Sequence, residues 1–369
     1  MLKQYKIKNY RFQLILLIGI LSVLGILLVG SAKPAMQTKQ IIGVVSGFII
    51  MTIVSMIDYN FILKFSWIFY FGMIGLLVLV KLPGVGKTTG GAQRWINIGG
   101  FQFQPSELAK ILLILFFAYF FMKHEEDLNT PKVIFLSLLL AGIPLVLILT
   151  QPALSTTICS TLIFITLLFV AGLSYKIVAW VLAICLPTGI IGFVLMIKGK
   201  IPFIKSYQIG RIMAWLYPDD YPDLAYQQQN SIMAIGSGQL FGKGLNNTAA
   251  TSVKNGNFIL ESQTDFIYAV AGEELGFIGT AAIILLLLFL TIECILIARK
   301  AKDLSGKLIC CGVAALIGFQ STINIFVATG LFPNTGIPLP FISYGLTSLW
   351  SLYIGMGLVL NVGLQPKKF

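Results

Sequence analysis

Apolar segments of membrane-spanning length recur along nearly the whole chain, and they restrict its fold more than any other feature. An α-helix needs about 20 residues to cross the hydrocarbon core of a bilayer, which is about 30 Å thick. We place ten such helices at 12–30, 40–57, 65–80, 107–122, 132–149, 155–172, 177–197, 266–297, 307–330 and 343–363. The sequence therefore predicts an all-α, polytopic integral membrane protein with ten transmembrane helices.

The composition agrees with a membrane protein and argues against other classes. Hydrophobic residues make up 57% of the 369 residues and charged residues only 11%, against about 25% charged residues in a soluble domain. The net charge of +12 does not indicate nucleic acid, because the basic residues lie at segment ends and form no stripe with interleaved aromatic residues. The 5 cysteines lie in apolar runs and the 1 histidine in a polar loop, so we predict neither a disulfide framework nor a zinc site.

The distribution of basic residues predicts the orientation of the chain. Most lysines and arginines of the short loops fall on one side when the N-terminus is placed in the cytoplasm, as the positive-inside rule requires. We expect one membrane domain over 1–369, with cytoplasmic tails at 1–11 and 364–369. A long extracellular loop, 198–264, then joins the seventh and eighth helices. No small-residue cleavage site follows the first apolar run, so we expect that helix to be retained.

The eighth segment, 266–297, is too long for one simple crossing, since its residues would make a helix of about 48 Å. Its first turns are expected to project past the lipid or to re-enter it. The uncharged stretch 275–292 is then the crossing itself.

This topology brings four distant stretches to the outer side of the membrane. They are the 81–106 loop with the helix start that follows it, the turn 150–155, the end of the long loop, and the Pro- and Gly-rich segment 334–343. Broken backbone at membrane depth is tolerated only inside protein or around a watery cavity. We therefore predict a polar cavity that opens to the outer leaflet.

Two charged residues in QPSELAK, Glu107 and Lys110, lie three positions apart and so share one helix face. Lys110 lies one turn inside an apolar run, where an unpaired ammonium group would be costly. A pair with Glu107 is therefore expected. A structural pair and a pair that contacts substrate remain equally open.

The carboxylate of Asp265 has two interpretations. Ser262 and Asp265 fit a capping box at the start of the eighth helix, which would make Asp265 structural. A lone carboxylate above a groove is alternatively suited to act as a general base. Gly272 and Gly276 lie on the same helix face as Asp265 and would let another segment approach closely.

Four long motifs resemble the SEDS family (shape, elongation, division and sporulation), which contains the RodA-, FtsW- and SpoVE-type proteins. The resemblance covers most of the chain, and short termini together with GAQRW followed by FQPSE favour the RodA branch. In chain order the motifs are GAQRWINIGGFQFQPSELAK (91–110), YQQQNSIMAIGSGQLFGKGL (226–245), TDFIYAVAGEELGFIG (264–279) and GIPLPFISYG (336–345).

The resemblance implies a peptidoglycan glycosyltransferase that polymerises lipid II at the outer face of the bacterial cytoplasmic membrane. It also implies a partner, a class B penicillin-binding protein that crosslinks the new glycan. The essential aspartate of the family's TDF motif falls on Asp265, and the glutamate and lysine of its PSE-x-x-K motif fall on Glu107 and Lys110. Candidate substrate-binding residues are Arg94, Glu107, Lys110, Lys243, Glu273 and Ser343.

The implied reaction suits these residue types. A sugar hydroxyl of one lipid II displaces the polyprenyl diphosphate of another and inverts the anomeric carbon, which requires one general base such as Asp265. The leaving diphosphate needs positive charge, which Arg94, Lys110, Lys243 or a divalent cation (Mg²⁺ or Mn²⁺) could supply. No ligand spacing in the sequence requires a metal, so we assign no metal-binding residue.

Two positions depart from the family pattern. Ala153 stands where QPALST would carry an aspartate in the family, and Leu346 follows Gly345 where the family has a glycine pair. The first change is compatible with an engineered variant, a weakened enzyme or a site that never needed the carboxylate. Two alternatives to the polymerase therefore stay open, a transporter of lipid-linked sugars and a scaffold that has lost catalysis.

Overall fold

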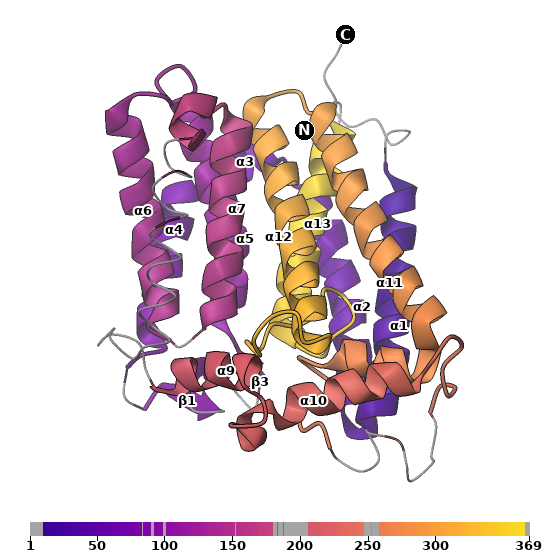
Figure 1. The fold of residues 1–369 in the computed structure, drawn as a ribbon. Coiled ribbons are helices and arrows are strands. Elements are labelled where there is room, and N and C mark those ends of the chain that lie inside the picture. The colour runs from indigo at the N-terminus through magenta and orange to yellow at the C-terminus, as the bar shows by residue number, and fades with distance from the viewer. Residues whose placement is uncertain are drawn as a thin grey trace.

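The structure, a computed structural model, is a bundle of long helices with short helices and a small sheet at one end (Figure 1). It describes residues 10–365 except 83, 90–91, 99–100, 152, 180–182, 184–186, 188–205, 247–251 and 253–257. The bundle contains α1 (Phe12–Ala32), α2 (Pro34–Met56), α4 (Ser66–Leu79), α5 (Pro105–Lys123), α6 (Pro131–Leu149), α7 (Leu154–Ala171), α11 (Ile267–Arg299), α12 (Leu304–Ala328) and α13 (Leu346–Leu364).

Within the described residues, 8 of these helices are long and apolar enough to cross a membrane. The helix at the predicted third span, α4, has 14 residues and is only about 21 Å long. Most of the predicted seventh span, 177–197, lies outside the described residues. The helical, multi-pass architecture is thus confirmed, although a small sheet is added to it. The count of ten crossings stays a prediction.

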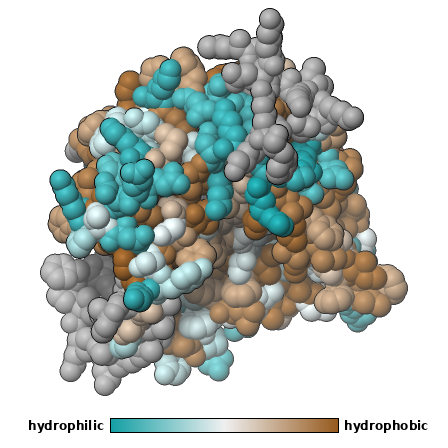
Figure 2. Space-filling model, turned by 90° about the horizontal axis from the view of Figure 1, so that it is seen from above, coloured by the Kyte–Doolittle hydropathy of each residue, from teal (hydrophilic) through white to brown (hydrophobic). Residues whose placement is uncertain are grey.

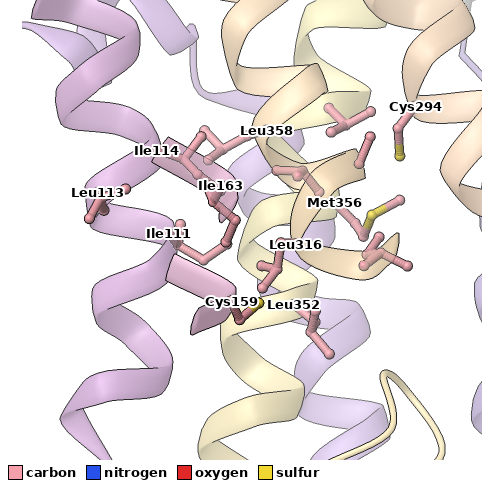
Figure 3. Close-up of a cluster of buried hydrophobic side chains, with 14 of the residues drawn as sticks. Ile111, Leu113, Ile114, Cys159, Ile163, Cys294, Leu316, Leu352, Met356 and Leu358 are labelled. Atoms are coloured by element: carbon pink, nitrogen blue, oxygen red, sulfur yellow. The ribbon is translucent and has the colours of Figure 1, made fainter. Parts of the chain in front are cut away.

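The core of the bundle lies between α5, α7, α12 and α13, where branched aliphatic side chains interdigitate (Figure 3). Two glycines let the helices approach closely. A Cβ atom at Gly312 would lie 2.7 Å from Ile114, and one at Gly355 would lie 2.9 Å from Ile111. By contrast, the outer helices α1, α2, α6 and α11 expose many large apolar side chains, as a lipid-facing surface requires.

The two ends of the bundle differ in character. At the end where α1 begins and α13 stops, Arg11 lies 3.9 Å from Glu293, near the end of α11. Asp303 caps α12 there and accepts a hydrogen bond of 2.8 Å from Tyr59, which belongs to the short helix α3 (Tyr59–Leu63). Hydrophilic side chains gather on this end, seen in Figure 2. The start of α1 and the end of α13 thus lie on one face, in agreement with the predicted topology.

The opposite end carries the sheet, α9 (Ser206–Leu216) and α10 (Pro222–Ser237), as Figure 1 shows. It contains a three-stranded antiparallel sheet that the sequence analysis did not predict, formed by β1 (Gly86–Thr89), β2 (Ala92–Ile98) and β3 (Phe101–Phe103). The described part of the long loop contains α9 and α10. Polar side chains of α10 hold it against the end of α12, since Gln228 and Ser231 donate to the carbonyls of Val327 and Ala328.

The helix α11 is broken at Gly276, which has φ 65° and ψ −165°. The segment 238–244 fills the break: the amides of Phe277 and Ile278 donate to the carbonyls of Gln239 and Leu240. In return, the carbonyls of Glu273 and Glu274 accept from two amides of that segment. The close approach expected at Gly276 is confirmed, because a Cβ atom there would lie 2.3 Å from the amide nitrogen of Gly242. The projection of the first turns past the lipid stays a prediction.

Candidate functional site

The carboxylate of Asp265 lies at the end of the bundle that carries the sheet, directly before α11. The capping-box interpretation is wrong, because the N-cap of α11 is Phe266 and has no side-chain cap. Asp265 is only partly buried, and no described residue donates a hydrogen bond to its carboxylate. Among the described residues, no side-chain or backbone donor ties this carboxylate into a structural hydrogen bond.

Burial nevertheless changes the chemistry of this carboxyl group. Loss of hydration raises the pKa of Asp265 to about 6, and the nearby carboxylates of Glu261 and Glu107 act in the same direction. The guanidinium groups of Arg94 and Arg211 oppose this increase in pKa. Asp265 thus lies within electrostatic range of two arginines and two glutamates, and its pKa is closer to neutrality than that of an exposed aspartate.

The Pro- and Gly-rich segment 334–343 forms one wall beside Asp265. Gly336 has φ 69°, and a Cβ atom there would lie 2.9 Å from Oδ2 of Asp265. Only glycine fits this close approach in a left-handed conformation. Ser343 fixes the far end of the segment, because its hydroxyl donates to the carbonyl of Thr264 (2.6 Å) and accepts from the amide of Leu339 (2.7 Å). Ser343 thus holds backbone rather than facing an open cavity.

The pair in α5 is formed as predicted. Nζ of Lys110 lies 2.9 Å from Oε1 of Glu107, and the two side chains are 1% and 3% exposed. Lys110 also donates to Oε1 of Gln320 in α12 (2.6 Å). Its ammonium group is therefore enclosed by protein partners, which favours the structural alternative for this lysine.

Two other candidates meet at the break in α11 instead of beside Asp265. Nζ of Lys243 lies 2.9 Å from Oε1 of Glu273, whose side chain is 2% exposed. The backbone amide of Lys243 also donates to the carbonyl of Glu273. Both contacts join the segment 238–244 to α11.

Arg94 lies in β2 and is half-buried. Its Nε atom is buried and has no hydrogen-bond partner among the described residues. Arg211 lies in α9, and its Nη1 donates to the carbonyl of Asn334 (3.0 Å). The sheet and the long loop therefore each bring one arginine to Asp265.

Ala153 is 1% exposed and occupies the N-cap position of α7, where it supplies no side-chain cap. An aspartate at this position has the right residue type to cap the helix. Ser155, two residues later, donates to the carbonyl of Thr335 (2.8 Å) and so ties α7 to the wall beside Asp265.

The described residues contain no group of three or more His, Cys, Asp or Glu side chains that could hold a metal ion. We therefore derive no catalytic step through a divalent cation. Among the described residues, Arg94 and Arg211 are the cations that act on the pKa of Asp265.

The sequence analysis missed several residues of the site. Arg211 was hidden in the long loop, although it is the arginine of an amphipathic stretch, SYQIGRIMAWL. Gln320 and Asn324 carry no charge, so a search for ionisable residues in apolar segments does not find them. Two amides four positions apart in an apolar helix are themselves an informative signal, since polar groups inside a membrane are costly.

Comparison with known proteins identifies the family. Residues 7–368 match the model of the cell cycle protein family FtsW/RodA/SpoVE. The chain belongs to this family. A probable peptidoglycan glycosyltransferase FtsW of Geobacter sp. (strain M18) is 35% identical over 375 residues, covering 98% of this chain and 99% of that protein. The stage V sporulation protein E of Bacillus subtilis (strain 168) is 37% identical over 325 residues, covering 87% and 84%.

Solved structures of this family have the same architecture. A chain of a peptidoglycan synthase complex, studied for its coordination of polymerization and crosslinking, has a TM-score of 0.77 at 28% identity, covering 96% of this chain and 97% of that one. The rod shape determining protein RodA of Thermus thermophilus has a TM-score of 0.68 at 27% identity, covering 96% of each chain. The sequence relatives described above are named FtsW and stage V sporulation protein E, so the preference for the RodA branch stays a prediction.

Proposed function

We infer that this chain is a multi-pass membrane protein with peptidoglycan glycosyltransferase activity. We propose that it polymerises lipid II with Asp265 as the general base. Its relatives over the full length carry the activity in their names. The observation that carries the assignment of the base is the environment of Asp265. Its carboxylate accepts no hydrogen bond from a described residue, its pKa is raised to about 6, and two arginines lie near it.

The proposed step is an inverting displacement. The acceptor hydroxyl oxygen bonds to the anomeric carbon of the donor, and the bond from that carbon to the diphosphate oxygen breaks. The hydroxyl proton passes to Asp265, and the polyprenyl diphosphate leaves with the electron pair. A carboxyl group with a pKa of about 6 is still about nine-tenths ionised at pH 7 and is a stronger base than an ordinary aspartate.

The arginines have the complementary role in this proposal. A diphosphate that leaves without a proton carries negative charge, and guanidinium groups bind phosphate oxygens in a bidentate manner. Arg94, whose buried Nε atom has no hydrogen-bond partner among the described residues, and Arg211 are the cations we propose to act on it, because both act on the pKa of Asp265. Lys110 and Lys243 are held by Glu107 and Glu273, so we assign them supporting roles.

We further propose that the site faces the outside of the cell and that both termini are cytoplasmic. The positive-inside rule supports this orientation. A cysteine introduced at Asp127, in the exposed loop between α5 and α6, should react with an impermeant reagent only after the membrane is opened. A class B penicillin-binding protein is the proposed partner, in keeping with the synthase complex that contains a similar chain.

The deciding experiment is polymerisation of purified lipid II by the chain in complex with its penicillin-binding protein. Asp265→Asn keeps the size of the side chain and removes the base, so glycan products should disappear. Asp127→Asn is the matched control, because Asp127 is exposed at the other end of the bundle and its product should not change. Equal activity of Asp265→Asn and wild type would refute the role of Asp265.

The same preparation separates the two alternative functions. A transporter would move lipid II across vesicles with no glycan product and would tolerate Asp265→Asn. A scaffold would bind its partner and show neither activity. Either result would refute the assignment as a polymerase.

A further inference from the structure

Two buried amide side chains of α12 hold the backbone around Asp265. Gln320 and Asn324 lie four residues apart, hence on one helix face, and are 0% and 1% exposed. A buried amide is costly unless it is hydrogen-bonded. The partners of these two side chains therefore show what the amides are for.

Asn324 joins two separate segments. Its Nδ2 donates to the carbonyl of Asp265 (2.8 Å) and to the carbonyl of Ile337 (2.7 Å). Its Oδ1 is buried and has no hydrogen-bond partner among the described residues. Because both contacts are with carbonyl oxygens, the amino group must face them, and the orientation of the amide is fixed.

Gln320 holds the next carbonyl along the same wall. Its Nε2 donates to the carbonyl of Pro338 (2.9 Å), and its Oε1 accepts from Lys110 (2.6 Å). Lys110, held by Glu107, thereby fixes the orientation of Gln320. The ion pair of α5 reaches the wall beside Asp265 through this glutamine.

Part of this arrangement follows from the backbone alone. The wall contains Pro338 and Pro340, which lack N–H groups and interrupt regular hydrogen bonding, and carbonyls away from water need donors. Hydrogen bonds to the carbonyls of Ile337 and Pro338 would not, however, require that the same side chain also bind the carbonyl of Asp265. One amino group that holds both Asp265 and Ile337 fixes the distance between the carboxylate-bearing residue and the wall.

We propose that Gln320 and Asn324 are positioning residues of the glycosyl transfer, and that Lys110 acts on the reaction through Gln320 rather than on the substrate. Asn324 sets the place of Asp265 relative to the wall at 334–343. Gln320 holds that wall at a fixed position along α12 through its bond to the carbonyl of Pro338. This inference rests on the proposed function for its catalytic meaning, but the geometry it describes can be tested separately.

The test uses Asn324→Ala and Asn324→Asp in the full chain with its partner. The second variant keeps the size of the side chain but replaces the donor with a carboxylate that faces two carbonyls. Asn361→Ala in α13 is the matched control. Asn361 is 0% exposed and also binds two backbone groups, the amide of Tyr59 and the carbonyl of Ser55, at the other end of the bundle.

Hydrogen–deuterium exchange gives a measurement that does not depend on activity. Peptides that cover 261–268 and 334–343 should both lose protection in the two Asn324 variants and keep it in Asn361→Ala. If neither peptide changes in Asn324→Ala, the proposal is overturned. This outcome is independent of whether any form of the chain polymerises lipid II.

Kinetics then test the catalytic meaning. A misplacement of about 1 Å can lower a rate about 100-fold, so kcat of Asn324→Ala should fall by about that factor while KM changes little. The acid limb of its pH profile should also move to a pH below about 6. A less firmly held Asp265 is better hydrated, which lowers its pKa, while the charged groups around it (Glu261, Glu107, Arg94 and Arg211) stay the same. A merely structural asparagine would reduce the amount of folded protein and leave kcat per folded molecule and the pH profile unchanged.

Gln320→Glu separates the two bonds of the glutamine. The new carboxylate still accepts from Lys110 but no longer donates to Pro338. A loss of kcat with normal folding is the expected result. If Gln320→Glu has the kcat of wild type and the same exchange over 334–343, Gln320 is removed from the proposal. If the wild-type chain itself forms no polymer, the proposed function is refuted instead.

Discussion

Replacement of Lys110 by methionine tests whether the buried pair of α5 serves the fold or the substrate. The Lys110 side chain is 1% exposed and that of Glu107 is 3% exposed, with Nζ and Oε1 2.9 Å apart. Removing one partner of such a pair leaves an uncompensated buried charge, which costs about 3–5 kcal/mol. The bond to Gln320 is lost as well, and an unsatisfied buried acceptor costs about 1–3 kcal/mol.

The double variant Glu107→Gln with Lys110→Met isolates the first of these contributions. It contains no buried charge, and replacing a buried ion pair by neutral groups is often nearly neutral in stability. Only the unsatisfied acceptor of Gln320 then remains. The free energy of unfolding of the double variant should therefore be about 3–5 kcal/mol higher than that of Lys110→Met alone. Thermal unfolding in detergent, followed by size-exclusion chromatography, measures both variants under one condition.

Two outcomes would refute this reasoning. If the double variant unfolds as early as Lys110→Met, the ion pair does not account for the loss. If Lys110→Met is as stable as wild type and yet inactive, the ammonium group acts on the substrate directly. The second result would also contradict the role that we give to Gln320.

Three further predictions concern other parts of the structure. Polymerisation should decline below about pH 6, because the pKa of Asp265 is raised to about 6 and only the ionised form accepts a proton; activity unchanged down to pH 4 would contradict this. The protein should stay folded there, as a folded state with the higher pKa binds the proton more tightly and gains stability as pH falls. Gly276→Ala should lower stability by about 1–3 kcal/mol, since its φ is 65° and a Cβ atom would lie 2.3 Å from the amide nitrogen of Gly242; thermal unfolding against Gly142→Ala, where a Cβ atom meets nothing within 4 Å, measures the difference. Ala153→Asp should change stability by about 1 kcal/mol through the cap of α7 and leave polymerisation within about threefold of wild type, whereas a polymer that forms only in the aspartate variant would show that the natural chain is disabled.

Sequence patterns predicted the parts of the fold that depend on hydrophobicity and charge. The crossings followed from segment length, and the convergence of distant loops on one face followed from counting those crossings. The actual contacts agree: Ser155 bonds to Thr335, Arg211 to Asn334, and Ser343 to Thr264. These side chains meet because the topology brings their loops to one end.

Features that depend on particular hydrogen bonds could not be predicted in this way. The sheet of 86–103 has no clear alternation of apolar and polar residues, and its register comes from pairing that the chain shows only when folded. The separation of Lys243 from Asp265 follows from the break at Gly276, where the segment 238–244 takes the place of a helical turn. The motif 264–279 contains both Asp265 and Glu273, but only Glu273 pairs with Lys243.

The break at Gly276 also divides α11 into two parts whose rotations about the helix axis would be linked in a continuous helix. From Phe277 to Arg299 the helix extends about 34 Å, close to the thickness of the hydrocarbon core, whereas the turns before Gly276 are bonded to the segment 238–244. Inserting one residue below the break would turn the rest of the crossing by about 100°. The same insertion would leave the hydrogen bonds above the break in place, and with them the position of Asp265. Such a rotation would instead move the buried face of this crossing, which includes Ile283, Leu287 and Leu290, out of the core. The break thus confines the effect of a helix insertion to the packing of the crossing.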